Sequence, residues 1–308
     1  MKTKIYKTSN FSILNSHYYC LFSLLFFLCS FFSQAQDYEW DWAKSGGGVN
    51  KYQLEPQGSL NFYNEMITDI VIDDDNNYYF LANLATGNTH VDGNPVTDYS
   101  ENPNGGMQNV FFSFTCDGTY RWSRPVGGGT TNTYKLTLDN EGGIYLMFSI
   151  HNVSLTTPVQ FSDEDIRPLY TGNSQEEQEA LRRVFLLKYD TDNGDLIWRK
   201  DIHGNVSSTN WFHCINDLQI DSNGILHTVV GFKQGVHIDG QLTVPVPEEN
   251  EYFKYYLLKF DSGTGNLIGT PLLLPMGGGA EHQYMSFRYD ENLNRYYIAG
   301  SKIYAFLG

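Results

Sequence analysis

The sequence predicts an all-β fold, a β-propeller of four-stranded antiparallel blades, on three observations. Tyr, Phe and Gly, which favour strands and tight turns, occur 22, 20 and 29 times in 308 residues, whereas Ala, the strongest helix former, occurs eight times. Apolar runs of strand length recur between clusters of turn residues. The same order of runs and turns then repeats along the chain, and a repeat of this kind determines the whole architecture.

The N-terminal segment reads as an export signal. Residues 1–36 contain no acidic residue, and three early lysines precede an apolar stretch over residues 18–32 and a small-residue cleavage site between Ala35 and Gln36. A membrane anchor is the alternative, but fifteen residues fall short of the roughly 20 needed to cross a bilayer. The sequence therefore predicts a signal peptide at 1–35 and a mature chain that is secreted or held at the outer cell surface, without a stable transmembrane span.

The mature chain is strongly acidic. It keeps 17 basic and 35 acidic residues, a formal charge of −18. A nucleic-acid partner is therefore not predicted, because phosphate binding needs a basic face. Two cysteines remain, Cys116 and Cys214, and we expect buried free thiols rather than one disulfide.

A tryptophan-bearing segment that ends in glycine marks one strand of each unit. It occurs at Trp42, Trp122 and Trp198, and without tryptophan at residues 272–279. The glycine runs lack the Lys-Ser/Thr ending and the following helix of a phosphate-binding loop. They are therefore interpreted as crossings between units.

An alternating apolar run that ends in aspartate and a turn follows each glycine run. The aspartates are Asp73, Asp139, Asp221 and Asp290, spaced 66, 82 and 69 residues apart. A second run follows each turn, so each pair is predicted to form a hairpin. Because compact propeller repeats span roughly 40 to 50 residues, the surplus is expected to form loops between the second and third strands.

A third apolar run completes each unit and leads through a turn back to the tryptophan strand. It recurs at residues 110–114, 184–190 and 255–261. Each unit therefore contains two hairpins, or four antiparallel strands. The predicted units of the 36–308 domain are residues 66–126, 134–202, 215–274, and 284–308 together with 38–44.

Repeated four-stranded units commonly stack radially as propeller blades, because each sheet then buries both faces against its neighbours. A β-sandwich is the alternative, but units of this length with large loops would each have little core. About four blades are visible, and two interpretations of the ends stay open. Residues 38–44 could complete the last blade, or the chain is a fragment of a longer propeller.

The fixed order of these motifs resembles bacterial β-propeller repeat proteins of the SBBP type. The motifs are the Trp strand, Gly-Gly, the Asp-turn hairpin, a His-Val-Asp-Gly or His-Ile-Asp-Gly loop (90–93, 237–240), and Phe-Leu-Leu-Lys-Tyr-Asp (185–190), over residues 40–300. The resemblance implies an exported propeller, often at the cell surface, and implies no catalytic residue. Residues 193–198 are also similar to quinoprotein-type propeller repeats.

The acidic turns invite a calcium interpretation. Residues 73–77 and 190–194 offer oxygen ligands, but a calcium loop would need Gly and Glu where Tyr78 and Leu84 stand. Asp and Asn also stabilise turns by bonding their own backbone. No histidine pair has a short metal-ligand spacing, so the sequence predicts turn chemistry, with no metal and no cofactor.

The functional expectation is a non-enzymatic module that binds a protein or a glycan. Its alternatives are a propeller hydrolase or lyase that uses channel carboxylates, and a structural surface spacer. No motif identifies a catalytic residue. A capping box predicts one helix from Ser174. Aromatic residues in loops are the expected contact sites: Tyr99, Tyr170, Trp211, Phe212, Tyr252 and Phe253.

Overall fold

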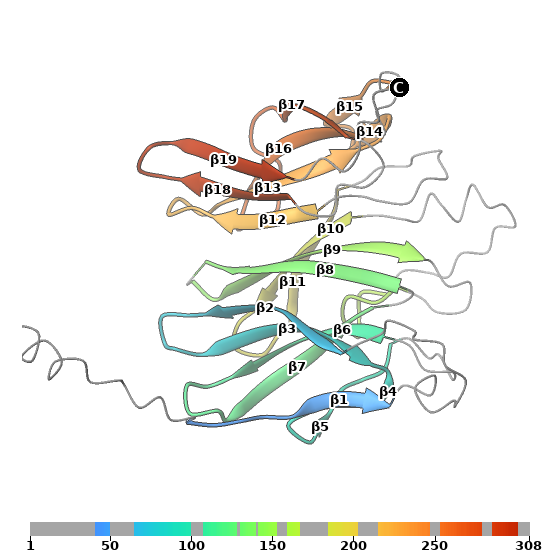
Figure 1. Cartoon of the computed structure of the whole chain (residues 1–308), viewed down its shortest axis with the longest axis vertical. Coiled ribbons are helices and arrows are strands. Elements are labelled where there is room, and N and C mark those ends of the chain that lie inside the picture. Colours follow the sequence, from blue (N-terminus) through green and yellow to red (C-terminus); the bar gives the residue numbers. More distant parts are fainter. Residues whose placement is uncertain are drawn as a thin grey trace, which may run out of the picture. The chain divides into compact units, whose positions relative to one another are not determined.

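In a computed structural model, the chain divides into two units, Met1–Asp41 and Trp42–Gly308. The structure describes residues 41–49, 65–99, 107–127, 130–139, 141–152, 159–166, 184–202, 215–246, 253–278 and 285–300 (Figure 1). Every regular element in these ranges is a β-strand. None of the described residues forms a helix long and apolar enough to cross a membrane.

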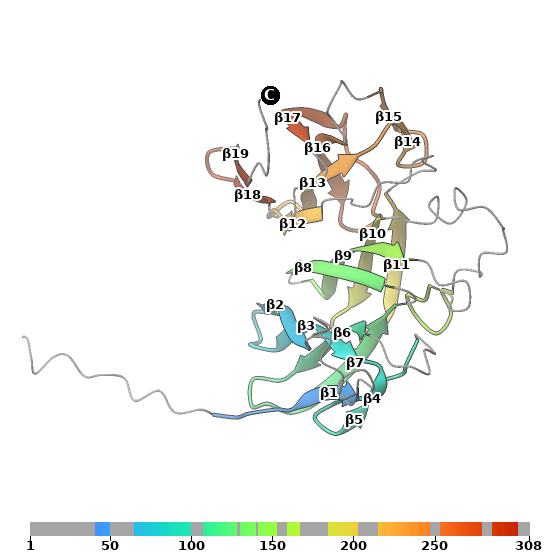
Figure 2. The ribbon, with the colours of Figure 1, turned by 45° about the vertical axis from the view of Figure 1, so that its right-hand side comes forward.

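Three four-stranded antiparallel sheets form most of the described chain, and in each the strands pair in chain order (Figures 1 and 2). The first sheet comprises β2 (Met66–Ile72), β3 (Tyr78–Ala85), β6 (Met107–Phe114) and β7 (Tyr120–Val126). The second comprises β8 (Thr130–Leu138), β9 (Gly143–Asn152), β10 (Val184–Asp190) and β11 (Leu196–Asp201). The third comprises β12 (Ile215–Ile220), β13 (Ile225–Phe232), β16 (Phe253–Asp261) and β17 (Leu272–Gly278). A last pair joins β18 (Met285–Asp290) to β19 (Arg295–Gly300).

The extra length between the second and third strands is partly folded. It forms the hairpins β4 (Gly87–Val91) with β5 (Asn94–Pro95), and β14 (Gly235–His237) with β15 (Leu242–Val244). The two His-x-Asp-Gly stretches lie at the tips of these hairpins, where Gly93 and Gly240 have positive φ angles of 76° and 88°. Both stretches are therefore turn sequences of short hairpins rather than open loops.

Buried apolar clusters join successive sheets. In β10, Phe185 and Leu187 pack in a cluster with the first sheet, whereas Val184 and Leu186 pack in a cluster with the third. Successive residues of a strand point to opposite faces, so a continuous apolar run places apolar side chains on both. The second sheet is accordingly buried on both faces.

The all-β class and the four-stranded antiparallel sheets are confirmed, while their closure as a propeller stays a prediction. The described residues of the predicted strand 38–44 form no strand, and β1 (Gly46–Val49) follows them and pairs with β4. Residues 38–40 and 301–308 and the expected helix from Ser174 lie outside the described residues.

The expectation of a buried thiol is wrong for Cys116. This residue is exposed and free in the turn between β6 and β7. Its carbonyl, rather than its thiol, makes the described contact, accepting a hydrogen bond from Trp42. Cys214 lies outside the described residues.

Candidate functional site

The repeated tryptophans each dock on a turn that joins the third and fourth strands of a sheet. Trp122 of β7 reaches the second sheet, and Trp198 of β11 reaches the third, while Trp42 precedes the first sheet and reaches its turn. In all three cases the indole Nε1–H donates to a backbone carbonyl. The acceptors are Cys116 at 3.1 Å, Thr191 at 3.0 Å and Ser262 at 3.2 Å.

A glycine lies under each docked indole ring. Gly118, Gly194 and Gly265 have φ angles of +78°, +74° and +68°, in the region that favours glycine. A Cβ at these positions would lie 2.6, 2.7 and 3.0 Å from the nearest atom of Trp42, Trp122 and Trp198. We call this arrangement the Trp–Gly lock. The repeated tryptophans and the repeated turn glycines are therefore two halves of one contact.

A second repeated contact lies in the turn between the first and second strands. The turn aspartate binds the ring residue six positions later: Tyr79 hydroxyl to Asp73 at 2.8 Å, and Tyr145 hydroxyl to Asp139 at 2.6 Å. Each aspartate also accepts the backbone N–H four residues on. Burial opposes ionisation, but these hydrogen bonds outweigh it and lower the pKa of both carboxyl groups. The expected turn chemistry is therefore present.

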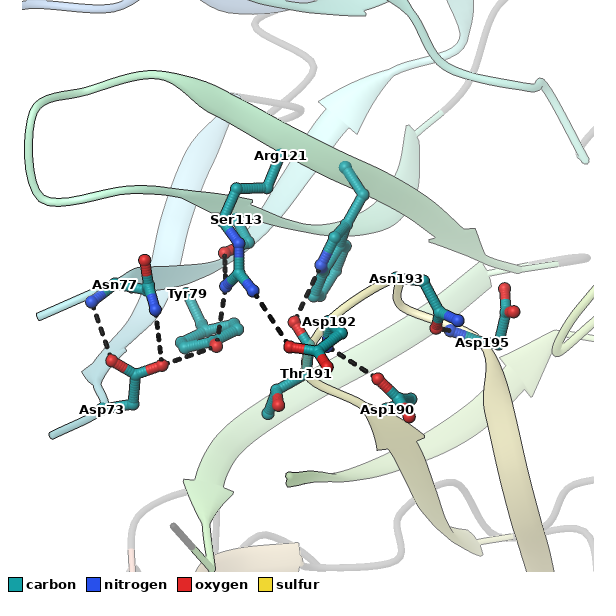
Figure 3. A network of polar contacts seen from close by, with 11 residues as sticks. Asp73, Asn77, Tyr79, Ser113, Arg121, Asp190, Thr191, Asp192, Asn193 and Asp195 are labelled. Carbon is teal, nitrogen blue, oxygen red and sulfur yellow. Dashed lines mark hydrogen bonds and ion pairs between the residues drawn. The ribbon is translucent and has the colours of Figure 1, made fainter. Parts of the chain in front are cut away.

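Arg121 connects the two repeated contacts between the first and second sheets (Figure 3). Its guanidinium donates to the Tyr79 hydroxyl at 2.8 Å and lies 3.5 Å from the Asp192 carboxylate in the turn of the second sheet. The neighbouring Trp122 donates to Thr191 in that same turn. The turns thus form a polar network that holds adjacent sheets together.

A related network joins the second and third sheets, but its cation binds within the second sheet and the crossing contacts come from Tyr145 and Trp198. The Lys188 ammonium lies 3.1 Å from Asp139 Oδ2. The Tyr145 hydroxyl, already 2.6 Å from that carboxylate, is also 3.1 Å from the Ser262 carbonyl that Trp198 contacts. The network is therefore a property of the repeat rather than of one turn.

The third copy of this contact contains a histidine. His227 Nε2 lies 3.1 Å from Asp221, and its Nδ1 lies 2.8 Å from the Tyr296 hydroxyl. The imidazole stacks on Tyr289 at a centroid distance of 4.4 Å. Burial lowers the pKa of His227, although Asp221 opposes this change. A neutral imidazole then donates Nε2–H to Asp221 and accepts the Tyr296 hydroxyl at Nδ1.

Charged side chains also occupy one repeated position within the first strands of the three sheets. Asp69, Lys135 and Asp217 each stand four residues before a turn aspartate. The Asp69 carboxylate lies 3.3 Å from the Lys135 ammonium and accepts the N–H of Leu136 at 2.8 Å. Burial raises the pKa of Asp217, and Lys135 opposes that change. Among the described carboxyl groups, Asp217 therefore best matches the acid expected of a propeller hydrolase, because it is buried and its pKa is raised.

The predicted aromatic contact sites are only partly described. Tyr99 is buried and donates its hydroxyl to Asp163 at 2.7 Å. Phe253 begins β16 and is buried in an apolar cluster, so its interpretation as a loop residue is corrected. The structure does not bring these two rings together in one cluster. The remaining predicted positions lie outside the described residues: Tyr170, Trp211, Phe212, Tyr252, Ala35 and Gln36.

Arg121, His227 and Asp217 had no predicted role. The repeat does carry a signal for His227, since it falls six residues after its aspartate, as Tyr79 and Tyr145 do. Nothing in the local sequence marks Arg121 or Asp217, because their partners lie in other sheets. His227 is therefore recognisable in the sequence as the one copy of the three at this repeated position that is not a tyrosine.

These features define an all-β protein of repeated four-stranded antiparallel sheets joined by Trp–Gly locks. No protein-family model matches the chain, and no curated protein matches it at a significant level. Within the described ranges, no group of three or more His, Cys, Asp or Glu side chains is arranged to hold a metal ion.

Proposed function

We propose that the protein is an exported, non-enzymatic β-propeller repeat protein that binds a protein or a glycan outside the cell. Its binding surface is formed by the connections between the second and third strands of each sheet. The observation that carries this proposal is the contrast between junctions that recur between successive sheets and connections that share a hairpin in only two of the three sheets.

The repeated part of each sheet is occupied by structural contacts. The turns between first and second strands and between third and fourth strands lie at the same end of a sheet whose strands pair in chain order. Backbone bonds join them, from Thr191 to Gly142 at 2.9 Å and from Ser262 to Gly224 at 3.0 Å. With the Trp–Gly locks, these bonds make that end a scaffold rather than a ligand site.

The connections at the opposite end vary more, since the first and third share a His-x-Asp-Gly hairpin tip and the second lacks that sequence. The first and third sheets carry the hairpins β4–β5 and β14–β15, whereas the second carries residues 159–166, which form only isolated bridges. Ile238 and Leu242 anchor β14–β15 in an apolar cluster, while Val236 and Thr243 are exposed. Variable segments on a rigid scaffold are where recognition usually resides.

A second candidate, a propeller hydrolase or lyase, is favoured by Asp217. A buried carboxyl with a raised pKa can hold the proton that a general acid delivers. Lys135 is paired with Asp69 and also opposes the rise in the pKa of Asp217, so charged side chains of three first strands interact along this row. Asp217 would be the first member of the acid pair that such an enzyme needs. The second member would be another carboxyl at a suitable distance from it.

The test uses the mature chain and two probes, an immobilised glycan library and immobilised extracellular proteins. We expect binding without glycan cleavage, and loss of binding in the double variant Val236→Glu, Thr243→Lys or in substitutions on β4–β5. Asp217→Asn serves as the matched control, since it leaves the connections unchanged. Glycan products that disappear in Asp217→Asn would support the enzyme instead, and absence of binding to both probes would contradict the proposal.

A further inference from the structure

The first strand of the second and third sheets buries its apolar face against the preceding sheet. Three residues before the turn aspartate stand Leu136 in β8 and Leu218 in β12, each 3% exposed. Leu136 packs in the cluster with the first sheet, and Leu218 in the cluster with the second. This position is therefore the receiving half of the sheet-to-sheet junction.

In the first sheet, the corresponding receiving half of the junction is exposed. Ile70 stands three residues before Asp73 and is 49% exposed, and Ile72 is 52% exposed. Ile70 pairs with Phe80, which stacks on Phe112 at 5.2 Å, so the bare strip continues into an aromatic face of the sheet. Apolar side chains gathered in this way are typical of an interaction surface.

Part of that face is already covered as in the other junctions. Trp42 contacts Tyr78 and Phe114 at centroid distances of 5.4 and 5.7 Å, besides docking on the turn. It therefore takes the place that Trp122 and Trp198 take on the later sheets. Among the described residues, no strands of a preceding sheet cover Ile70 and Ile72.

The last hairpin presents the donating half of the junction. In each of the three sheets, the residue two positions before the turn aspartate pairs across the hairpin with an aromatic residue. The ring of that aromatic residue is buried against the next sheet. These residues are Tyr79, Tyr145 and His227, each at most 1% exposed. In β18–β19 the residue two positions before Asp290 is Arg288, and it pairs with Tyr297, which is 53% exposed.

We propose that these two faces bind each other in different copies of this chain, so that the ring of sheets continues between copies and is not closed within one chain. The Tyr297 face of one copy packs on the Ile70 face of the other and repeats, between copies, the junction that the chain makes internally. The occupant follows from continuity, because one chain carries both halves of an interface that it already forms between its own sheets. Such an interface is heterologous, head to tail, and closes or extends according to its rotation.

The experiment measures the mass of the mature chain in solution by light scattering over a range of concentrations. The wild type is expected to associate, and Ile70→Glu and Tyr297→Glu are each expected to be monomeric. Val246→Glu, at an exposed apolar position just after β15, should associate like the wild type. Circular dichroism checks that all variants are folded, which their exposed positions favour.

Mixing the two monomeric variants is the decisive step. The Tyr297 face of the Ile70→Glu chain is intact, and so is the Ile70 face of the Tyr297→Glu chain. An equimolar mixture should therefore form one junction and give a dimer. A wild type that is monomeric at every concentration would overturn the proposal, as when the chain closes these faces on itself. Association lost only in Ile70→Glu would also overturn it, because that result indicates like faces pairing.

Discussion

At the residue scale, one substitution within the repeat changes the chemistry of a junction. Tyr79 and Tyr145 bind their aspartates through hydroxyl groups that stay protonated over the physiological range, since the pKa of each is raised. His227 fills the same position with an imidazole, whose ordinary pKa of about 6.5 is far below that of tyrosine. The junction between the third sheet and β18–β19 is therefore the one of the three that contains a histidine, the side chain whose charge ordinarily changes between about pH 5 and 8.

We predict that stability depends on the protonation of His227. Its folded-state pKa lies below the ordinary value of about 6.5, so the unfolded chain binds more protons as pH falls through that value, and the free energy of unfolding decreases. The groups facing the imidazole are Asp221, Lys259, Glu291 and the rings of Tyr289 and Tyr296.

The measurement is urea unfolding between pH 5 and pH 8 for the wild type and for His227→Tyr, which restores the repeat. The variant should lose part of the decrease in stability at acid pH. His237, whose pKa burial also lowers, is present in both chains and cancels in the comparison. Identical pH profiles would show that His227 does not titrate as argued.

The Trp–Gly lock gives a second prediction at this scale. Gly194→Ala should cost about 1–2 kcal/mol for the left-handed backbone and about 1–3 kcal/mol more for the clash with Trp122. Gly93→Ala is the matched control, because Gly93 also has a positive φ but no atom lies within 4 Å of its added Cβ. Equal losses in chemical denaturation would mean that the indole contact contributes nothing.

At the scale of elements, strands were predictable where periodicity is strong, and registers were not. Counting six residues from Asp290 reaches Tyr296, yet β18 and β19 pair Tyr289 with Tyr296. This register moves Tyr297 into the position of Tyr79. Phe253 follows an acidic stretch that suggests a loop, but pairing with Gly278 extends β16 to it. Pairing between distant strands decides both cases, and local sequence does not encode it.

The candidate junction residues show the same limit. The tryptophans and the turn glycines are each visible as repeats, but their contact depends on which turn faces which strand. Gly194 lies 72 positions beyond Trp122. Arg121 and Asp192 are likewise 71 positions apart and meet only in the folded chain. Sequence analysis could therefore identify the components of the network, but not their partners.

The Trp–Gly lock predicts how strongly neighbouring sheets are coupled. Trp122→Phe keeps an apolar ring but removes the N–H that binds Thr191, at an expected cost of about 0.5–1.5 kcal/mol. Hydrogen exchange should quicken at the β10–β11 turn. Trp198→Phe should instead affect the β16–β17 turn, so each variant is the control for the other. Equal effects of both variants on both turns would contradict a local lock.

At the scale of the whole molecule, the proposed export route predicts the form in which the protein acts. We predict that the signal peptide is removed after Ala35, leaving a chain that begins at Gln36 with a formal charge of −18. Mass spectrometry of the protein from the culture medium or cell surface tests this. Ala35→Arg should block cleavage at that bond, while Gln34→Asn should leave it unchanged. Full-length protein retained inside the cell would contradict the export route.

Burial on both faces of the second sheet predicts how the described sheets unfold. Phe185 and Leu187 belong to the cluster shared with the first sheet, and Val184 and Leu186 to the cluster shared with the third. Because β10 carries both sets, loss of either cluster exposes a strand on which the other depends. The three sheets should therefore unfold in one transition, with tryptophan fluorescence, which reports the locks, and far-ultraviolet circular dichroism, which reports the strands, giving the same midpoint. Leu186→Ala should lower that shared midpoint, at a cost of about 2–5 kcal/mol. Two separated transitions in the wild type would show instead that each sheet is stable by itself, as expected of separate sandwich-like modules.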